Sequence, residues 1–468
     1  MAISIQQKNT LLGSLPSIDA TISTIYPAAL KEKKADTIIV LDDDPTGTQT
    51  VHGVPVLTDW SKESILREFE QNTPLFYILT NSRSLTQEDT IQLTRKIGQH
   101  IKSAAIQTDT QYWIISRSDS TLRGHYPTEI EALEFCLPLE KSVQFLIPAF
   151  FEGGRYTIND IHYVEQEDHF IPAAQTIYAK DHVFGYQSSD LKDWILEKSR
   201  GKVSKEQISS ISIQMLRTTS VESLTQQLDD LAPNSICIIN AADYADLHTF
   251  SAALCKSSIQ PVFRTAASFV ASIAGIDSLP LLGRKDILRD SKNGGLIIVG
   301  SYVDTTTRQL QYLLKEKPGL AAFEIDIPTV LKMHNLNLFI EQLIGQIEQS
   351  LLAGQSAVLF TSRKLVSAVT EQEKQQIAQK VSSILTAVVQ GIRVHPSFLL
   401  SKGGITSSDI ATKGLGIKRA IVLGQVLKGV PVWKLGPETK FPGSVQIIFP
   451  GNVGQDTSLV TIVDNLQS

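Results

Sequence analysis

The chain has 468 residues, a formal net charge of -5 and a hydrophobic content of 42%. This length exceeds what a single hydrophobic core supports, so we expect two large domains, with three as the alternative. The absence of a basic excess argues against nucleic-acid binding, and no apolar run reaches the roughly 20 residues that a membrane span needs.

Residues 1–36 are polar and helical in character, and they lack the charged start, apolar middle and cleavage site of a signal peptide. We expect them to form an N-terminal helical extension. Three isolated cysteines lie in apolar surroundings, at Cys136, Cys237 and Cys255. Their spacing is typical of reduced core cysteines in a cytoplasmic protein rather than of a disulfide or zinc framework.

The first predicted strand covers residues 37–41 and runs into the sequence Asp-Asp-Asp-Pro-Thr-Gly at residues 42–47. An apolar, β-branched run that ends in acids, proline and glycine predicts a buried parallel strand followed by a tight loop. Ligands of open α/β sheets bind at the carboxyl ends of such strands. Adjacent carboxylates repel one another unless a cation, a metal ion or a proton compensates them. The alternative is a solvated acidic turn.

Polar and charged residues also follow three further apolar runs, at residues 75–79, 112–115 and 143–147. A helical pattern at residues 62–71 separates the first strand from the run at 75–79, and another at residues 87–105 separates that run from the one at 112–115. The alternation predicts a doubly wound, mostly parallel sheet, so the residues that follow the strands should meet at one edge. The less regular stretch 159–201 is expected to form a lid or an excursion beside the cleft.

The second half repeats the alternation of strands and helices after a linker expected at residues 276–294. Its clearest predicted elements are strands at 296–299, 321–327 and 357–360 and an amphipathic helix at 338–352. The overall prediction is an α/β protein of two domains, each with a mostly parallel sheet flanked by helices, that face a central cleft. We place the domains at residues 37–280 and 281–468.

Candidate substrate-binding residues gather near the predicted strand ends of the first domain. The arginines there are Arg83, Arg117, Arg123, Arg155 and Arg264. An arginine fork can donate two parallel hydrogen bonds to a substrate carboxylate. Asp43, Asp44 and Asp119 are candidates for a general base or for holding a magnesium ion, and they could titrate together, so the sequence does not assign the base. His125 and His162 are candidates for contacts with hydroxyl groups, against a structural role.

In the second domain, Gly403 and Gly404 stand between an apolar run and a predicted helix. Glycines let backbone amides approach a ligand closely, and the start of a helix carries partial positive charge that suits phosphate. Lys402 adds a formal charge. The alternative is a strand–turn–helix in which Thr406 or Ser407 only caps the helix. Two further pairs follow predicted strands and could line the same pocket, Gly300-Ser301 and Gly451-Asn452.

The acidic run also supports a competing hypothesis. Asp42, Asp44 and Thr46 satisfy the Asp-x-Asp-x-Thr motif of haloacid-dehalogenase-type phosphatases, with Asp42 as the nucleophile and Asp44 as the acid/base. However, no later strand ends convincingly in the further pair of acids that would complete a magnesium site. This hypothesis also gives the second half of the chain no function.

Taken together and in order, these segments resemble the four-carbon acid sugar kinase family, long carried as a domain of unknown function. Residues 43–47 resemble the family's Asp-Asp-x-Thr-Gly block, and residues 80–83 resemble its Thr-Asp-Ser-Arg block. Residues 119–124 match its Asp-Ser-Thr-Leu-Arg-Gly block at every position. The other matching blocks are Pro148-Ala149-Phe150 with Gly154-Arg155 and His162, Val299-Gly300-Ser301, Gly403-Gly404-x-Thr406 and Gly451-Asn452.

The resemblance implies an ATP-dependent kinase that phosphorylates a hydroxyl of a small sugar acid such as threonate, erythronate or an oxo-tetronate. It implies ATP and Mg²⁺ as cofactors and the sugar acid as partner, and it leaves a homodimer open. The catalytic candidates become Asp43, Asp44 and Asp119. The implied substrate-binding residues are Arg83, Ser120, Thr121, Arg123, Gly124, Arg155 and His162. The implied nucleotide-binding residues are Ser301, Gly403, Gly404, Ile405, Thr406, Gly451 and Asn452.

The chain departs from the family mainly on the substrate side. Thr48-Gln49-Thr50 stands where the family usually has Ala-Asn-Asp, Asn81 replaces an aspartate, and Arg117-Ser118 replaces Lys-Ile. On the nucleotide side, Ile405 stands where an acid is common. These changes leave the identity of the acid open, and they support a further hypothesis, a sugar-acid-binding protein without catalytic activity.

Overall fold

The computed structural model describes most of the chain. The described residues are 3–134, 136–288, 292–363 and 371–467. Part of the linker predicted at residues 276–294 therefore lies outside them. Within the described residues, no helix combines the length and the apolar composition that a membrane span requires.

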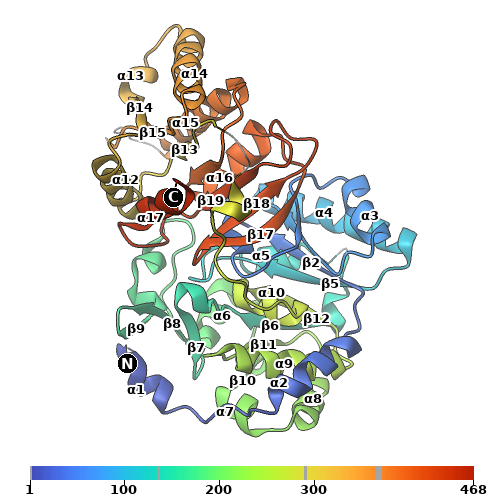
Figure 1. Cartoon of the computed structure of the whole chain (residues 1–468). Coiled ribbons are helices and arrows are strands. Elements are labelled where there is room, and N and C mark those ends of the chain that lie inside the picture. The colour runs from blue at the N-terminus through green and yellow to red at the C-terminus, as the bar shows by residue number, and fades with distance from the viewer. Residues whose placement is uncertain (1–2, 135, 289–291, 364–370, 468) are drawn as a thin grey trace. The chain divides into compact units, whose positions relative to one another are not determined.

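The chain folds into two compact units (Figure 1). The first comprises Met1–Val51 and Asp59–Ser278, and the second comprises His52–Thr58 and Leu279–Ser468. Each unit contains a mostly parallel sheet flanked by helices. The predicted two-domain α/β fold is thereby confirmed.

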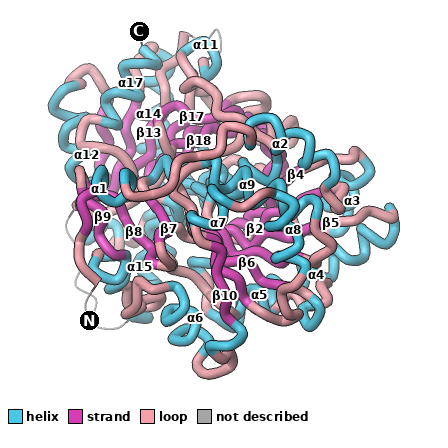
Figure 2. Tube along the Cα trace, turned by 90° about the horizontal axis from the view of Figure 1, so that it is seen from below, coloured by secondary structure: helices cyan, strands magenta, loops and turns pink. Residues whose placement is uncertain are grey.

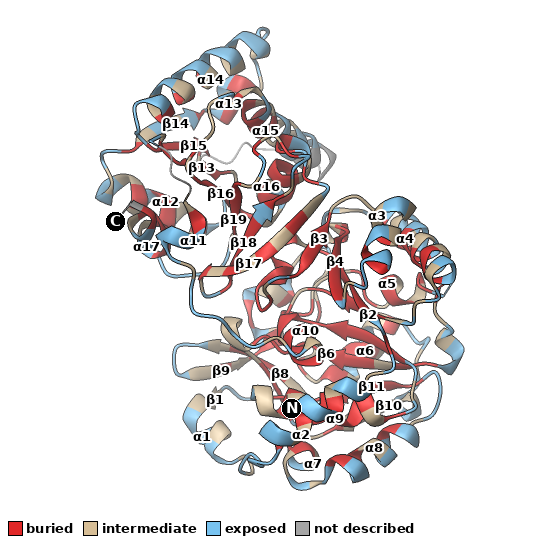
Figure 3. Cartoon of the chain, turned by 45° about the vertical axis from the view of Figure 1, so that its right-hand side comes forward, coloured by how far each residue is buried: buried red, intermediate tan, exposed pale blue. Residues whose placement is uncertain are grey.

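The sheet of the first unit contains parallel strands in the order β10-β11-β6-β12-β5-β2-β4. Their bounds are β2 (Thr37–Asp42), β4 (Leu75–Leu79), β5 (Tyr112–Arg117), β6 (Val143–Ile147), β10 (Ile208–Ile211), β11 (Ile236–Ile239) and β12 (Pro261–Thr265). The central strands are apolar and buried because helices cover the sheet (Figure 3). The register places Asp42 beside Leu79 on one neighbour and Arg117 on the other. Polar residues that follow these strands therefore meet at one edge.

Two groups of helices flank this sheet. In one group, α3 (Lys62–Glu70) packs on α4 (Gln87–Thr108), and in the other, α9 (Tyr244–Lys256) contacts α2 (Ile22–Ala29), α8 (Val221–Asp229) and α10 (Ala267–Ala274). Side-chain caps fix where the helices begin; Thr86 Oγ1, for example, accepts from Asp89 N at the start of α4. The smaller helices are α1 (Lys8–Gly13), α5 (Thr128–Glu131), α6 (Leu191–Ser199) and α7 (Ile213–Thr218).

A small antiparallel sheet lies beside the main sheet of the first unit (Figure 2). Its strands, in order, are β1 (Gln6–Gln7), β9 (His169–Pro172), β8 (Ile161–Gln166) and β7 (Arg155–Ile158). The stretch 159–201 thus contains two paired strands that its irregular pattern did not predict. The N-terminal extension contains α1 and α2, but it also contributes strand β1, whose pairing with β9 no local pattern encodes.

The second unit has a parallel core with an antiparallel margin. The parallel strands follow the order β14-β15-β13-β16-β19, and β18, β17 and β3 continue the sheet in antiparallel fashion. Their bounds are β3 (Pro55–Leu57), β13 (Leu296–Val299), β14 (Ala321–Ile325), β15 (Ala357–Thr361), β16 (Leu399–Lys402), β17 (Arg419–Leu427), β18 (Val430–Leu435) and β19 (Val445–Phe449). The flanking helices are α11 (Arg284–Ile287), α12 (Asp304–Glu316), α13 (Ile327–Val330), α14 (Leu336–Leu352), α15 (Glu371–Gly391), α16 (Gly404–Asp409) and α17 (Ser458–Gln467).

Strand β3 comes from the N-terminal part of the chain and yet belongs to the second unit. Its residues Pro55, Val56 and Leu57 pair with Ile421, Ala420 and Arg419 of β17. Sequence reasoning assigned this segment to the first domain, because strand partners far apart in the chain leave no local signal. The chain accordingly leaves the first unit after Val51 and returns to it at Asp59.

Candidate functional site

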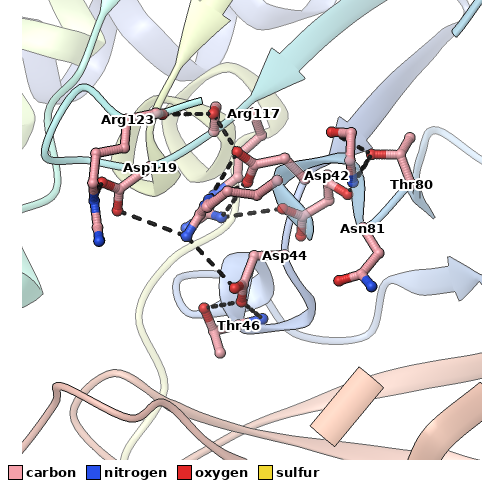
Figure 4. Close-up of polar contacts among 12 residues, drawn as sticks. Asp42, Asp44, Thr46, Thr80, Asn81, Arg117, Asp119 and Arg123 are labelled. Atoms are coloured by element: carbon pink, nitrogen blue, oxygen red, sulfur yellow. Dashed lines mark hydrogen bonds and ion pairs between the residues drawn. The ribbon is translucent and has the colours of Figure 1, made fainter. Parts of the chain in front are cut away.

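The acidic loop after β2 is held by its own hydroxyl and amide groups. Asp44 accepts hydrogen bonds from Thr46 N at 2.9 Å and from Thr46 Oγ1 at 2.6 Å, and so caps the short helix Pro45–Thr48. The proline at the first position of this helix supplies the φ angle that the turn needs. This cap fixes the carboxylate of Asp44 against Thr46 (Figure 4).

Arg83 compensates the charge of the three predicted catalytic aspartates. Its guanidinium donates to Asp43 through Nη2 at 2.5 Å and through Nε at 3.1 Å. Its Nη1 lies 3.5 Å from Asp44 and 3.9 Å from Asp119. Burial alone would raise the pKa of Asp43, but the charge and hydrogen bonds of Arg83, with help from Arg117, hold that pKa below its ordinary value. Arg83 thus holds the three carboxylates of Asp43, Asp44 and Asp119 together, and we call these three residues the aspartate layer. Arg83 is therefore not a free anion-binding group.

Asp42 precedes the aspartate layer in the chain, and its side chain is buried. It is 1% exposed, and its carboxylate pairs with Arg117 Nη1 at 3.1 Å. Burial raises the pKa of Asp42 to about 7 even though Arg117 opposes the shift. A Cβ on Gly47 would lie 2.1 Å from Asp42 Oδ2, so the loop can close over the carboxylate only because residue 47 is glycine. The nucleophile of the phosphatase hypothesis is therefore not placed to meet a substrate.

Asp119 is anchored within its own loop. Arg123 Nε donates to it at 2.7 Å, and Thr121 Oγ1 donates to the same oxygen. Burial opposes ionisation, but Arg123 and then Arg83 hold the pKa of Asp119 well below its ordinary range. Gly124 has a φ of 122°, and a Cβ there would lie 2.5 Å from Ser118 Oγ. Thr121 and Gly124, both predicted to bind substrate, thus shape the loop that presents Asp119.

Arg155 differs from the other predicted arginines. Its guanidinium has no hydrogen-bond or ion-pair partner among the described residues, and its Nε is buried. It faces the ring of Tyr178 at 5.7 Å, and Arg123 faces the same ring at 5.1 Å. A cation without a carboxylate partner, placed next to the aspartate layer, is the best placed group for an anionic ligand.

His162 has both ring nitrogens engaged by the protein. Nε2 donates to Ser120 O at 2.7 Å, and Nδ1 lies 3.1 Å from Thr157 Oγ1. The side chain is 0% exposed, and burial lowers its pKa to about 4. His162 was expected to bind substrate, but in this structure its ring forms a hydrogen bond with the backbone carbonyl of Ser120. Ser120 itself is buried as well.

Two buried groups of this site were not singled out as site residues from the sequence. Glu129 on α5 is 8% exposed, and Ser82 donates a hydrogen bond to its Oε1. Ser118 donates to Asp43 Oδ2. Neither a glutamate in a short helix nor a serine beside an arginine carries a pattern that marks it as part of a site.

In the second unit, the predicted nucleotide-binding glycines converge after β13, β16 and β19. Gly403 has a φ of 115°, and a Cβ there would lie 2.8 Å from Ser301 Cβ. A Cβ on Gly451 would lie 3.1 Å from Ser301 Oγ. Thr306 Oγ1 ties the loops together by donating to Gly451 O at 2.9 Å. The three loops therefore lie against one another at the carboxyl ends of the parallel strands.

The remaining predicted nucleotide residues occupy different positions. Gly404 starts α16, Thr406 lies within that helix, and Ile405 and Asn452 are exposed. Lys402, in contrast, is 0% exposed, and its Nζ donates to Pro450 O at 2.5 Å. Burial lowers its pKa to about 6, so it does not supply the formal charge that its sequence position suggested.

Comparison with known families identifies the family to which this chain belongs. Residues 38–273 match a family model described as "Sugar-binding N-terminal domain", and residues 296–459 match one described as "Nucleotide-binding C-terminal domain". The chain belongs to the four-carbon acid sugar kinase family. The aspartate layer lies in the sugar-binding domain of this family, and the loops that contain Gly403 and Gly451 lie in its nucleotide-binding domain.

Solved structures share the fold of this family member. A Salmonella typhimurium LT2 protein, provisionally named a tRNA synthase, aligns with a TM-score of 0.64 and 15% identity over 91% of this chain and 98% of its own. A Haemophilus influenzae protein from the family of unknown function aligns with a TM-score of 0.58 and 14% identity over 92% of this chain and 99% of its own. A search of curated proteins found no match.

Gly403→Ala is expected to weaken nucleotide binding at least tenfold, because the added Cβ would meet Ser301 Cβ at 2.8 Å and the φ of 115° disfavours a side chain. Isothermal titration with ADP measures the change. The matched control is Gly345→Ala in α14, where a Cβ meets nothing within 4 Å. Unchanged ADP affinity in Gly403→Ala would remove this loop from the nucleotide site.

Proposed function

We propose that this protein is an ATP-dependent kinase that transfers a phosphoryl group to a hydroxyl of a small sugar acid. The proposal rests chiefly on one observation, the unpartnered guanidinium of Arg155 next to partly exposed aspartates in a sugar-binding domain. A sugar acid brings a carboxylate for the arginine and a hydroxyl for an aspartate. A neutral sugar would leave the half-buried guanidinium of Arg155 without a partner.

The aspartates divide by accessibility. The side chain of Asp43 is 2% exposed and bound to Arg83, whereas those of Asp44 and Asp119 are 17% and 12% exposed. We assign Asp43 to hold Arg83, and we assign the contact with the substrate hydroxyl to Asp119 or Asp44. A carboxylate that stays ionised can accept the hydroxyl proton as the phosphoryl group arrives.

The nucleotide side supports ATP as the phosphoryl donor. Phosphoryl transfer depends mainly on positioning and charge stabilisation, and the closely packed loops at Ser301, Gly403 and Gly451 would supply both. The described residues contain no group of three His, Cys, Asp or Glu placed to hold a metal ion. We therefore propose that Mg²⁺ arrives on the triphosphate, where it would neutralise charge and would need few protein ligands.

Thr50 stands where most of the family has an acid expected to touch substrate. Its hydroxyl donates to Ala267 O at 2.8 Å, and the residue is 8% exposed. An ionised aspartate could not donate this hydrogen bond, so the surroundings are matched to threonine. Position 50 therefore lacks the negative charge of the usual family site, as does position 81, where Asn81 replaces an aspartate. Both changes favour a substrate that is more acidic or less hydroxylated.

The test is a screen of four- to six-carbon sugar acids for ATP consumption, with the phosphorylated position of the product read by NMR. ADP release that depends on one acid is the expected result. Phosphate release from phosphoesters without nucleotide would support the phosphatase instead. Binding of an acid without turnover, with ATP bound at the same time, would support the non-catalytic binding protein.

A further inference from the structure

Glu129 is a buried carboxyl group for which the proposed chemistry has no use. It lies on α5, 8% exposed, and no cation among the described residues forms an ion pair with it. Its Oε1 accepts a hydrogen bond from Ser82 Oγ, while its Oε2 is buried and has no partner. An ionised carboxylate with one unsatisfied oxygen in such a position is costly, whereas a protonated one is much less so.

The charged groups around Glu129 come from three elements. Asp43 follows β2 and raises the cost of a second negative charge, while Arg264 on β12 and His125 before α5 oppose that effect. Arg264 is 3% exposed and donates to Arg123 O at 3.1 Å, which engages it elsewhere. Burial and then Asp43 raise the pKa of Glu129 despite Arg264. The electrostatic balance agrees with the geometry.

Ser82 links Glu129 to the aspartate layer. Its hydroxyl lies 3.2 Å from Thr80 Oγ1, and its carbonyl accepts from His125 Nε2 at 3.2 Å. The next residue in the chain is Arg83, which holds Asp43. Any shift of Ser82 therefore shifts the backbone that carries the Arg83 guanidinium.

We propose that Glu129 is a positioning residue of the acceptor site, a neutral carboxylic acid in the folded protein that holds Ser82 and thereby the Arg83 loop. This inference rests on the proposed function for its catalytic consequence. Glutamine has the same shape, keeps an oxygen for Ser82 and carries no charge, so Glu129→Gln should substitute for it. Alanine cannot.

The test compares full-length wild type, Glu129→Gln and Glu129→Ala, with Glu131→Gln as the matched control. Glu131 lies on the same helix but pairs with Lys202 at 2.8 Å at the surface. With the acid identified by the screen, Glu129→Gln should keep kcat within about threefold of wild type at pH 7. Glu129→Ala should lose at least tenfold in kcat while its KM for ATP stays unchanged.

Two readouts need no turnover, so they separate failure of this inference from failure of the proposed kinase activity. The Nε–H NMR resonance of Arg83, assigned with Arg83→Lys, should move in Glu129→Ala and stay in Glu129→Gln. A raised folded-state pKa gives stability below the unfolded pKa that is lost as the pH rises through the folded one. The melting temperature of wild type should therefore fall relative to Glu129→Gln as the pH rises above the ordinary pKa of a glutamate.

The opposite pattern would overturn the inference. If Glu129 were ionised and compensated Arg264, Glu129→Gln would be less stable than wild type at neutral pH, this deficit would vanish as the pH falls, and its Arg83 resonance would move. If Glu129 were only a packing residue, Glu129→Ala would lower the melting temperature but leave the Arg83 resonance in place.

Discussion

Asp119→Asn is expected to lower kcat by about 10²- to 10⁴-fold, the range typical for loss of a general base or its equivalent. The amide cannot accept the substrate proton and cannot compensate Arg123, which donates to Asp119 at 2.7 Å. The fold should survive, because Arg123 also lies 3.7 Å from Asp181. Steady-state kinetics with the acid found by the screen measures the effect, and ADP titration should show unchanged nucleotide affinity.

Two comparisons sharpen this experiment. Asp44→Asn tests the other partly exposed aspartate, and the variant with the larger kcat loss identifies the group that meets the hydroxyl. Asp193→Asn, at an exposed position in α6, is the control for the substitution itself. Because the pKa of Asp119 is held well below its ordinary value, wild-type activity should show no acid limb from this group above pH 5. Wild-type kcat in Asp119→Asn would leave the contact with the hydroxyl to Asp44, and wild-type kcat in both variants would contradict the assignment.

Lys402→Met is expected to stabilise the second unit at neutral pH. Lys402 lies 3.6 Å from the centroid of the Phe449 ring, and no carboxylate among the described residues pairs with it. The ring face favours the ammonium form, but burial dominates and lowers the pKa from 10.5 to about 6. At pH 7 the folded protein therefore holds mostly the neutral amine, whereas the unfolded chain is protonated.

The pH dependence fixes the sign of this prediction. Between about pH 6 and 10 the unfolded state binds the additional proton, so the free energy of unfolding of wild type rises with pH by about 1.4 kcal/mol per unit from this group. Lys402→Met lacks that slope. It also loses the hydrogen bond to Pro450 O, at a cost of about 1 kcal/mol at every pH, so its advantage should shrink and then reverse as the pH rises.

Urea unfolding at several pH values between 6.5 and 9.5 measures this slope. Lys428→Met, at an exposed position between β17 and β18, is the control and should keep the wild-type slope. An equal pH slope in wild type and Lys402→Met would show that Lys402 is protonated in the folded protein. The ring of Phe449 would then hold a buried ammonium ion.

The sequence predicted the architecture of this protein better than the pairing of its charges. Apolar runs that end in polar residues identified β2, β4, β5 and β6, because strand burial is written in local composition. The arginines were all assigned to a substrate anion, yet Arg83, Arg117 and Arg123 are bound to aspartates. The pairs Arg83–Asp43 and Arg117–Asp42 depend on how neighbouring strands are aligned, which local composition does not encode, whereas Arg123 and Asp119 are four residues apart in one loop.

The protonation of single buried residues could not be predicted from the sequence, for a different reason. Lys402 and Glu129 look like ordinary charged residues in the sequence, and only tertiary burial changes their protonation. His162 matched a family block but supports a backbone carbonyl in the structure. The order of the family blocks identified the family because many positions had to match at once. A single charged residue gives no such information about its own surroundings.

The crossing of the chain at residues 52–58 limits how this protein can be divided. A fragment that starts at Leu279 would retain β17 but lack β3, and the donor and acceptor groups that β3 satisfies along β17 would be exposed as a free sheet edge. Such a fragment is expected to aggregate. The segment 52–58 should prevent this aggregation when it is added as a separate peptide or fused ahead of residue 279. The two units are therefore not independently exchangeable modules, and recombination at the single boundary near residue 278 would not transplant an intact nucleotide-binding unit.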